Sequence, residues 1–332
     1  MGGILDGKVA IITGAGRGIG GAHALAFADQ GASIVVNDSG GRMDGAGSDH
    51  SIAEATAAKI QAAGGVAIAD HSDLADWGLA RQLVERCISA YGKVDILVNN
   101  AGIVQYSTIL EETEESWRRT LAVNLGATAA MLHWVGVHWR DAGAKPGRAV
   151  VNTCSPTATA PNSGCAAYSA SKGAIATLTL TSAIELADLG ARVNAIVPVA
   201  RTRMSESVTI LADAIKPVSE GFDRMSPEHA ARAALYLASP SCKFTGRLLG
   251  IEGDEAWLYT GYSVNHYRSN ENKPWSVEDL ASAFSNVSYA DMIKIIAQSA
   301  PLSIEAPDAE VFEALAKVER GEPAKLVPFL HT

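Results

Sequence analysis

Near the start of the chain, a strand pattern, a glycine-rich turn and a helix pattern follow one another without a gap. No other feature restricts the fold as much. The apolar run Val9–Ile12 shows no polar alternation, which is typical of a strand buried on both faces of a parallel sheet. The Ala-rich stretch Gly21–Gln30 is a plausible helix. Glycines let a backbone pass close to a pyrophosphate, and a helix N-terminus offers free N–H groups. This succession predicts a dinucleotide site rather than a bare tight turn, with contacts from Gly14, Arg17, Gly18, Ile19 and Gly20.

The second strand pattern, Ser33–Asp38, ends in an acid. A carboxylate at this place can hydrogen-bond ribose hydroxyls and repels a 2′-phosphate, so Asp38 favours NAD over NADP. Arg17 in the glycine turn favours the opposite, because its charge could pair with that phosphate. We give Asp38 more weight, because it stands where the extra phosphate would lie. The alternative role for Asp38 is that of a turn residue at the end of a strand.

A long Gly- and Asp-rich link, Ser39–Ser51, follows the second strand, and we expect it beside the adenosine half of a bound dinucleotide. The next strand pattern, Gly65–Ala69, is followed by Asp73 and Leu74, which are predicted cofactor contacts. Asp73 can accept from the adenine amino group. It can equally cap the helix predicted at 77–91, and the two roles are compatible.

Amide side chains mark two further places in the first half. The strand pattern Val94–Val98 ends at two asparagines, an alanine and a glycine. Amides can brace neighbouring backbone, and the small residues leave room for a flat ring, so the predicted cofactor contacts here are Asn100, Ala101 and Gly102. Asn124 lies in the helical stretch Trp117–His133, where a buried amide is costly unless it is hydrogen-bonded. It either braces the fold or holds a water next to Lys172.

Tyr168 and Lys172 lie four residues apart in a segment of small residues and helix formers, which predicts that they share one helix face. An ammonium beside a phenol favours the phenolate, so we expect Lys172 to lower the pKa of Tyr168. A phenol tuned in this way can exchange a proton with an alcohol or ketone oxygen near neutral pH. Ser155 follows the apolar run Ala149–Val151, a predicted strand, and its hydroxyl could reach the same oxygen. Alone, a tyrosine and a lysine at this spacing are weak evidence, since most such pairs lie on surface helices.

Together and in this order, these motifs resemble the short-chain dehydrogenase/reductase family over roughly residues 4–250: the glycine pattern Thr13–Gly20, the run Asn99–Gly102, and then Asn124, Ser155, Tyr168 and Lys172. The resemblance implies an α/β fold with a Rossmann-like, doubly wound parallel sheet and helices on both faces. It also implies a catalytic tetrad of Asn124, Ser155, Tyr168 and Lys172. In that tetrad the tyrosine is the general acid/base and the serine polarises the carbonyl. The lysine lowers the pKa of the tyrosine and binds ribose, and the asparagine holds a relay water.

Narrower features resemble the (3R)-hydroxyacyl-CoA dehydrogenase part of the peroxisomal multifunctional enzymes of type 2. They are the segment Val36–Gly41 with its long link, the segment Pro198–Met204, and the extended C-terminus. This resemblance implies a 3-hydroxyacyl-CoA or a hydroxysteroid as substrate. The family usually has Pro-Gly where this chain has Pro198 and Val199. Thr202, in the same segment, is expected to hold the carboxamide of nicotinamide.

The leading interpretation is therefore an NAD-dependent dehydrogenase for a secondary alcohol on a largely apolar small molecule, an acyl-CoA or a steroid or terpenoid alcohol. NADPH-dependent reduction of a ketone or terpenoid is the alternative that Arg17 favours and Asp38 opposes. A non-catalytic, nucleotide-sensing scaffold is a third, which the complete tetrad disfavours. The family resemblance also implies a homodimer or homotetramer, formed through the helices at 117–133 and 168–188.

Composition narrows the class of protein. The net charge of −9 argues against a nucleic-acid partner. The histidines are scattered, and the cysteines fit no metal or redox spacing, so we predict no metal site. No apolar run approaches the ~18 residues of a membrane-spanning helix. The N-terminal residues show no signal-peptide pattern, so we expect a cytoplasmic protein. The cysteines are Cys87, Cys154, Cys165 and Cys242.

The family pattern ends with the last predicted strand, Leu248–Gly253. We therefore divide the chain into an NAD-binding domain, 1–253, and a C-terminal extension, 254–332. The extension shows helix patterns at 277–284, 290–299 and 309–320. They are too short for a core of their own, so we expect the extension to pack on the main domain or on a neighbouring subunit. In the family, the segment Arg201–Met225 is the mobile substrate loop. Its apolar residues either close over a substrate or form an ordinary helix face: Val208, Ile210, Leu211 and Ile215.

Overall fold

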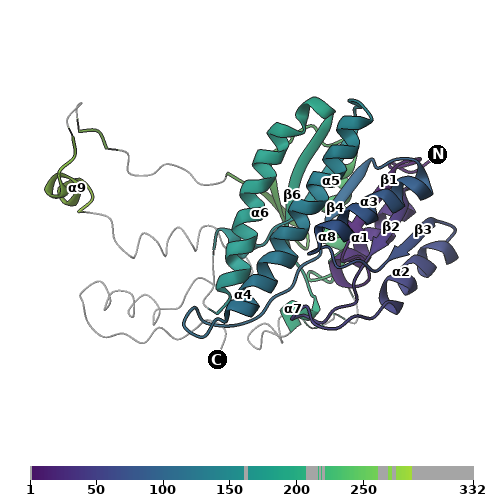
Figure 1. Ribbon diagram of the computed structural model, residues 1–332, viewed down its shortest axis with the longest axis horizontal. Coiled ribbons are helices and arrows are strands. Elements are labelled where there is room, and N and C mark those ends of the chain that lie inside the picture. The colour runs from purple at the N-terminus through teal and green to yellow at the C-terminus, as the bar shows by residue number, and fades with distance from the viewer. Residues whose placement is uncertain are drawn as a thin grey trace. The chain divides into compact units, whose positions relative to one another are not determined.

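The structure is a computed structural model, which describes residues 2–160, 164–206, 216, 218, 221–260, 268–270 and 274–285, without the side chains of residues 205 and 206. The chain divides into two compact units, Met1–Tyr259 and a second one that begins at Thr260 (Figure 1). The described part of the second unit holds one helix, α9 (Val277–Ala283), which begins at a Ser276 capping box. All strands and the other described helices belong to the first unit.

Eight strands form one sheet in the order β3-β2-β1-β4-β5-β6-β7-β8. Strands β1 to β7 pair in parallel, and β8 runs antiparallel to β7. Such an order, reversing direction at β1, places the crevice for a dinucleotide at the carboxyl ends of the strands beside β1. The predicted fold class is confirmed. The strands are β1 (Val9–Thr13), β2 (Ser33–Asn37), β3 (Val66–Asp70), β4 (Ile96–Asn99), β5 (Arg148–Thr153), β6 (Ala191–Val199), β7 (Leu248–Glu252) and β8 (Glu255–Tyr259).

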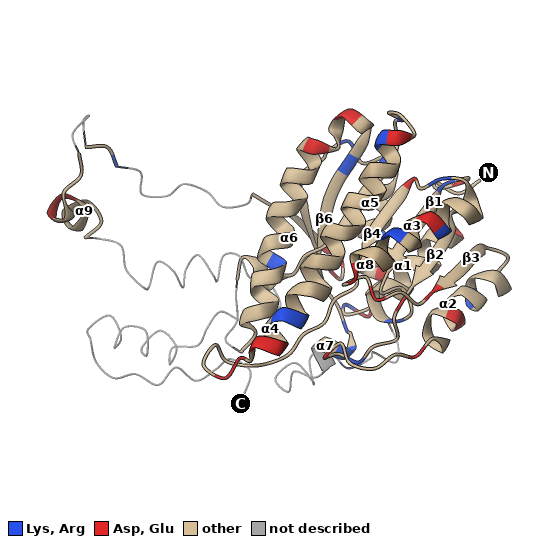
Figure 2. Ribbon diagram, viewed as in Figure 1, with Lys and Arg blue, Asp and Glu red and all other residues tan. Residues whose placement is uncertain are grey.

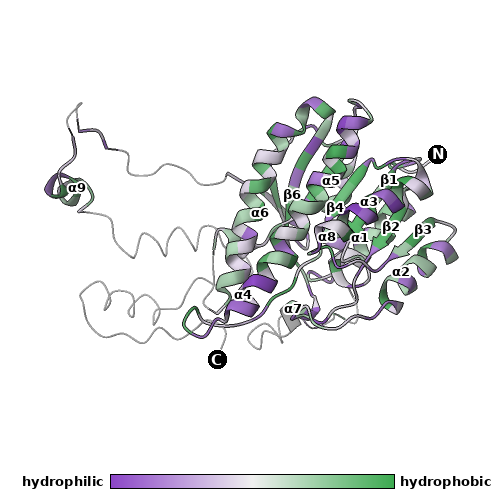
Figure 3. Cartoon of the chain, in the orientation of Figure 1, coloured by the Kyte–Doolittle hydropathy of each residue, from purple (hydrophilic) through white to green (hydrophobic). Residues whose placement is uncertain are grey.

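Helices cover both faces of this sheet (Figure 1). Neighbouring residues of one strand point to opposite faces, so Ile12 belongs to one core cluster and Ile11 to the other. Phe27 of α1 (Gly18–Asp29) packs in the first cluster, and Trp139 of α5 (Ala127–Asp141) packs in the second. Figure 3 shows the apolar strands between these layers. The main helices are α1 (Gly18–Asp29), α2 (Ser51–Ala62), α3 (Trp77–Tyr91), α6 (Ala166–Glu185) and α8 (Pro227–Ala238), with a short α7 (Arg203–Glu206).

One long helical segment consists of α4 (Glu114–Leu121), a π-helical turn (Ala122–Gly126) and α5 (Ala127–Asp141). Among the described residues it is the one segment whose length and composition would allow it to cross a membrane. Half of its most apolar 18-residue stretch is buried inside the protein. Trp139 of this segment belongs to the core cluster beside the sheet. Charged residues occur mainly in the helices and loops around the sheet (Figure 2). A π turn widens the helix locally, and here it directs Asn124 inward, where the side chain is fully buried.

The sheet reaches further along the chain than the predicted domain boundary at residue 253. β8 (Glu255–Tyr259) follows β7 after a tight turn at Gly253, and the division between the two units falls after Tyr259. The packing of the extension on the main domain or on a neighbour stays a prediction. The predictions for the substrate-loop residues at 208–215 and for helices at 290–299 and 309–320 lie outside the described residues.

Candidate active site

The glycine-rich turn joins β1 to α1 at the carboxyl edge of the sheet. Gly14 and Gly18 have φ values of +61° and +54°, a left-handed conformation that favours glycine. A Cβ on Gly20 would lie 2.0 Å from the carbonyl oxygen of Gly14, so turn and helix are in direct contact. Arg17 is the N-cap residue of α1 and makes no side-chain cap, and Ile19 is partly exposed on the first helical turn. The turn is therefore a cradle of backbone at a helix N-terminus, which suits a pyrophosphate.

The segment after β4 holds this turn in place. The Asn100 side chain donates to the carbonyl oxygens of Thr13 at 3.0 Å and Gly14 at 3.2 Å. The N–H of Ala101 donates to the Thr13 hydroxyl at 3.0 Å. A Cβ on Gly14 would lie 2.8 Å from the Cα of Ala101, so the two backbones touch. The amide side chain thus has the bracing contacts expected of it.

Asp38 follows β2 and points back to the glycine turn. Its carboxylate accepts from the N–H of Gly16 at 2.9 Å and from the N–H of Gly40 at 2.8 Å. These bonds support the role of a turn residue at the strand end, and the contact with ribose stays a prediction. Arg17 donates to the carbonyl of Gly41 at 3.3 Å.

Arg203, the first residue of α7, was not identified from the sequence. Burial lowers its pKa, the nearby Arg17 lowers it further, and Asp38 opposes both effects. Two arginines therefore lie near the same strand end as Asp38. The run Arg201-Thr202-Arg203 was the signal in the sequence, but its nearness to β2 depends on the fold.

Asp73 does not cap α3, because Asp76 occupies the N-cap position and accepts from the first N–H groups of the helix. The capping role considered for Asp73 was therefore wrong. Its carboxylate instead forms an ion pair with Arg119 of α4 at 2.8 Å. Leu74 is 4% exposed with its side chain in the core, so it can face a cofactor only through its backbone.

Asn124 makes three hydrogen bonds from its buried side chain. Its Oδ1 accepts from the N–H of Ile103 at 2.8 Å, and its Nδ2 donates to the Ile103 carbonyl and to the Ser171 hydroxyl, each at 3.0 Å. A Cβ on Gly102 would lie 3.4 Å from Asn124 Oδ1 and 3.6 Å from Lys172 Nζ. The amide and the ammonium therefore border the same small space. These bonds support the bracing role, and the water-holding role stays a prediction.

Tyr168 and Lys172 lie one turn apart on α6, as predicted from their spacing. Lys172 Nζ donates to the carbonyl of Thr153, the last residue of β5, at 2.8 Å, and lies 5.6 Å from the centroid of the Tyr168 ring. Ser155 follows the same strand, and its hydroxyl accepts from the N–H of Thr157 at 3.3 Å. The end of β5 and the first turns of α6 thus bring a phenol, an ammonium and a hydroxyl together.

Burial raises the pKa of the Tyr168 phenol, and the hydrogen bond with Ser155 opposes that rise. Burial lowers the pKa of Lys172 to about 8. The prediction that Lys172 lowers the pKa of Tyr168 was therefore wrong for the chain by itself. The reason is desolvation: the loss of water disfavours the phenolate and also disfavours the ammonium that was expected to support it.

The departure from the family pattern at Val199 has a local explanation. Val199 is the last residue of β6 and pairs with Glu252 of β7, so its extended backbone requires no glycine. Thr202 lies shortly beyond it. A Cβ placed on Gly18 would be 4.0 Å from Thr202 Cγ2, so Thr202 faces the glycine turn across the sheet edge. This is where its predicted contact with a carboxamide would have to be made.

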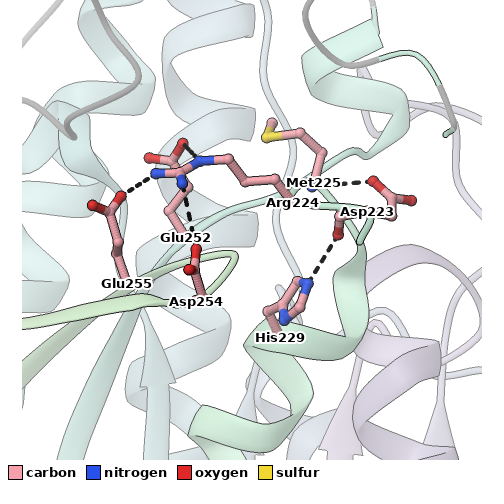
Figure 4. A network of polar contacts seen from close by, with 7 residues as sticks. All are labelled: Asp223, Arg224, Met225, His229, Glu252, Asp254 and Glu255. Carbon is pink, nitrogen blue, oxygen red and sulfur yellow. Dashed lines mark hydrogen bonds and ion pairs between the residues drawn. The ribbon is translucent and has the colours of Figure 1, made fainter. Parts of the chain in front are cut away.

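A charge cluster beside this segment also escaped the sequence analysis. The Arg224 guanidinium contacts three carboxylates at the β7–β8 turn, those of Glu252, Asp254 and Glu255 (Figure 4). The Glu252 side chain is 0% exposed, and its contact with Arg224 Nε is 2.9 Å. The adjacent Asp223 pairs with Arg201, which follows β6. The cluster ties the residues after β6 to the end of β7.

Within the described residues, no group of three or more His, Cys, Asp or Glu side chains could hold a metal ion. All four cysteines are free and buried. Cys154 lies beneath the candidate site, with its Sγ 3.3 Å from the Lys172 carbonyl oxygen, and burial raises the pKa of its thiol. A buried thiol of raised pKa is a poor nucleophile, so Cys154 is a packing residue of the site.

Comparisons with known proteins agree with this geometry. The family described as short chain dehydrogenase matches residues 8–210. The chain is 32% identical over 320 residues to the peroxisomal multifunctional enzyme type 2 of Drosophila melanogaster. The aligned region covers 95% of this chain and 50% of the Drosophila protein. It thus spans about half the length of this relative. It is also 32% identical over 285 residues to the hydroxyacyl-CoA dehydrogenase ChsB1 of Mycobacterium tuberculosis, covering 84% of this chain and 87% of that one.

A solved structure with a similar fold is a 7α-hydroxysteroid dehydrogenase complexed with NADH and 7-oxo glycochenodeoxycholic acid. The two structures superpose with a TM-score of 0.66 and share 32% sequence identity. The match covers 75% of this chain and 94% of the steroid dehydrogenase chain. The resemblance inferred from the glycine turn, the asparagines and the Ser, Tyr and Lys side chains is thereby confirmed. The chain belongs to the short-chain dehydrogenase family, whose members are NAD(P)-linked oxidoreductases.

Proposed function

We propose that the protein is an NAD-dependent dehydrogenase that interconverts a secondary alcohol and a ketone on a largely apolar small molecule. A 3-hydroxyacyl-CoA or a hydroxysteroid is the proposed substrate. The observation that carries the proposal is the meeting of Tyr168, Lys172 and Ser155 at the end of β5, beside the Asn124 amide. The relatives named for hydroxyacyl-CoA and hydroxysteroid chemistry support the substrate class.

The residues present fit a dinucleotide. The positive φ of Gly14 and Gly18 and the contact at Gly20 leave a backbone cradle for the pyrophosphate. Asp38 would accept from the adenosine ribose, and Thr202 would hold the carboxamide. Bound there, NAD would supply the hydride acceptor. Every proton movement then falls to the side chains of the chain itself.

In alcohol oxidation, the Tyr168 oxygen takes the proton of the substrate hydroxyl, and in ketone reduction it returns one. The Ser155 hydroxyl donates to the substrate oxygen and so stabilises the negative charge that develops there. Lys172, held at the Thr153 carbonyl, keeps positive charge close to the phenol and would bind ribose. Asn124 would hold a water that continues this proton path.

The decisive experiment measures formation of reduced nicotinamide with NAD⁺ or NADP⁺ across acyl-CoA, steroid and terpenoid alcohols. We expect turnover with NAD⁺ and a 3-hydroxyacyl-CoA or a hydroxysteroid. Tyr168→Phe should lower kcat by about 10²- to 10⁴-fold while NAD⁺ still binds. Tyr236→Phe, the same change on α8, is the matched control and should keep full activity. Retained turnover in Tyr168→Phe would refute the assignment, and binding of NAD without any turnover would favour the scaffold alternative.

A second candidate, NADPH-dependent reduction of a ketone or terpenoid, has one observation in its favour. Arg17 and Arg203 lie near the end of β2, where two cations could receive a 2′-phosphate. Asp38 opposes this because its carboxylate is fixed at the same place. Asp38→Ala should therefore raise kcat/KM for NADP⁺ relative to NAD⁺. If wild-type protein already prefers NADP⁺, the second candidate replaces the first.

Assembly and location remain proposals. We propose a homodimer or homotetramer, to be measured by light scattering, with no nucleic-acid partner. We propose a cytoplasmic location, although the Drosophila relative is named as peroxisomal. Imaging of the tagged protein in its own cell would distinguish the two compartments.

A further inference from the structure

The long Gly- and Asp-rich link between β2 and α2, residues 39–50, forms a compact loop. Its two ends touch, because a Cβ on Gly40 would lie 2.2 Å from the backbone N and O of Asp49. Its tip is a tight turn, in which Arg42 donates to Ala46 at 2.9 Å and Gly45 donates to Arg42 at 3.0 Å through the backbone. We call this segment the β2–α2 loop (Figure 1).

The tip of the β2–α2 loop is fastened to the segment that follows β4. The N–H of Val104 donates to the Met43 carbonyl at 3.2 Å. The Gln105 side chain donates to the Asp44 carbonyl at 3.1 Å. In the sheet, β2 and β4 lie on either side of β1. The loop therefore passes from one side of the glycine turn to the other, across the edge where an adenosine ribose would lie.

Arg119 of α4 supplies a further attachment. Its Nη2 donates to the Gly45 carbonyl at 3.1 Å and pairs with Asp73 Oδ2 at 2.8 Å. A Cβ on Gly45 would lie 2.9 Å from Ile103 and 3.1 Å from Arg119 Nε, and the φ of Gly45 is +77°, so the contact depends on glycine. One guanidinium thus joins segments that follow β2 and β3 to a helix that follows β4.

We propose that Arg119 is a positioning residue for the adenosine half of the cofactor, holding the β2–α2 loop as a strap over that half. Asp73 acts through Arg119, since one of its oxygens pairs with the guanidinium and the other accepts from the N–H of Ala75 at 3.1 Å. The pairing makes this carboxylate an anchor for the strap, and its remaining lone pairs leave room for the predicted contact with the adenine amino group. The inference rests on the proposed NAD site and adds two roles to it.

The test compares Arg119→Gln with Arg118→Gln by calorimetric binding of NAD⁺ and of ADP-ribose. Arg118 is the adjacent residue of α4 and pairs only with Glu114 among the interactions described, both of them exposed, which makes it a matched control. Removal of a charge-assisted hydrogen bond should weaken both ligands by about 5- to 30-fold in Arg119→Gln. Arg118→Gln should bind like wild type. Turnover at saturating NAD⁺ should change by less than about twofold, since the strap does not contact the reacting atoms.

Hydrogen exchange gives a readout that a loss of overall stability would not reproduce. The backbone N–H groups of Arg42, Gly45 and Ala46 should exchange faster in Arg119→Gln, while those of the sheet should not. If Arg119→Gln does not fold, Gly45→Ala breaks the same contact from the loop side and should weaken ADP-ribose similarly. Equal affinity of wild type and of the folded variant for ADP-ribose would overturn the proposal.

The variant Asp73→Asn tests whether Asp73 holds the strap through Arg119. If Asp73 acts through Arg119, Asp73→Asn and Arg119→Gln should each weaken NAD⁺, and the double variant should be no weaker than the worse single variant. The same pattern is expected with the hypoxanthine analogue of NAD⁺, which lacks the adenine amino group, because the anchor role does not involve that group. Additive losses with that analogue would overturn the anchor role. Absence of NAD⁺ and ADP-ribose binding to wild type would instead refute the proposed function.

Discussion

The burial of Lys172 makes a prediction about how stability depends on pH. Its side chain is 3% exposed, and burial lowers the pKa of its ammonium from 10.5 to about 8. At about pH 7 the lysine is charged in both the folded and the unfolded chain, so folding bears the full desolvation penalty. With one pKa unit worth about 1.4 kcal/mol, that penalty is about 3 kcal/mol.

The penalty is relieved as the pH rises through the folded pKa. Between about pH 8 and 10.5 the unfolded chain binds this proton and the folded chain does not, so the free energy of unfolding increases with pH. From about pH 7 to about pH 9.5, Lys172 should add about 2 kcal/mol of stability. Burial raises the pKa of Tyr168, so its opposite contribution begins only near the pKa of an unfolded tyrosine, about 10.

Urea unfolding of wild type and of Lys172→Met at these two pH values measures the effect. The wild type should gain about 2 kcal/mol relative to the variant on going to the higher pH. Burial raises the pKa of the Cys87 thiol to about 12, so this thiol lowers the stability of both proteins equally as the pH rises. Lys243 also donates to a backbone carbonyl at 2.8 Å but is exposed, so Lys243→Met should follow wild type. Parallel pH profiles for wild type and Lys172→Met would mean that water reaches the ammonium, and the reasoning would fail.

Three further changes test other contacts. Gly20→Ala places a Cβ 2.0 Å from a backbone oxygen of the glycine turn, so calorimetry should find NAD⁺ binding weakened at least about 100-fold. Asn124→Leu leaves a buried N–H and C=O without partners, which costs about 2–4 kcal/mol and should lower the Tm by about 5–15 °C, with an unchanged Tm refuting the bracing role. Arg224→Met leaves the buried Glu252 carboxylate without its cation, so the free energy of unfolding in urea should fall by about 2–3 kcal/mol. This value is below that of a fully buried pair because the arginine is partly exposed to water. Adding Glu252→Gln should restore most of that stability, whereas a further loss would contradict the pairing.

Much of the fold could be predicted from the sequence because its signals are local. A strand buried on both faces has a short apolar run as its sequence pattern, and the glycine turn indicates where the following helix begins. The predicted ends of β1, α1 and β2 therefore lie close to the observed ones. The π turn at Asn124 could not be predicted, because one extra residue in a helix leaves the apolar pattern nearly unchanged. β8 was missed because the strand follows a tight turn and lies beyond the end of the family pattern.

The contacts of the site were less predictable than its members. Asp73 and Arg119 are far apart in sequence, and only the packing of α4 beside the carboxyl edge brings the guanidinium to the carboxylate. Arg224 and its carboxylates are joined in the same way by the pairing of β6 with β7 (Figure 4). A sequence shows which charged residues a site can contain, but it does not show which of them form ion pairs with one another.

The raised pKa of Tyr168 also bears on the direction of the reaction. A phenol that holds its proton is ready to protonate a ketone oxygen, whereas alcohol oxidation requires it to accept one. Lys172 is still mostly charged near neutral pH, where its pKa is about 8, but its charge does not bring the pKa of the buried phenol down to the ordinary value. Oxidation therefore needs further positive charge beside the phenol, and an oxidised nicotinamide ring carries such a charge while a reduced one does not. The redox state of the cofactor would thus decide how far the tyrosine can act as a base.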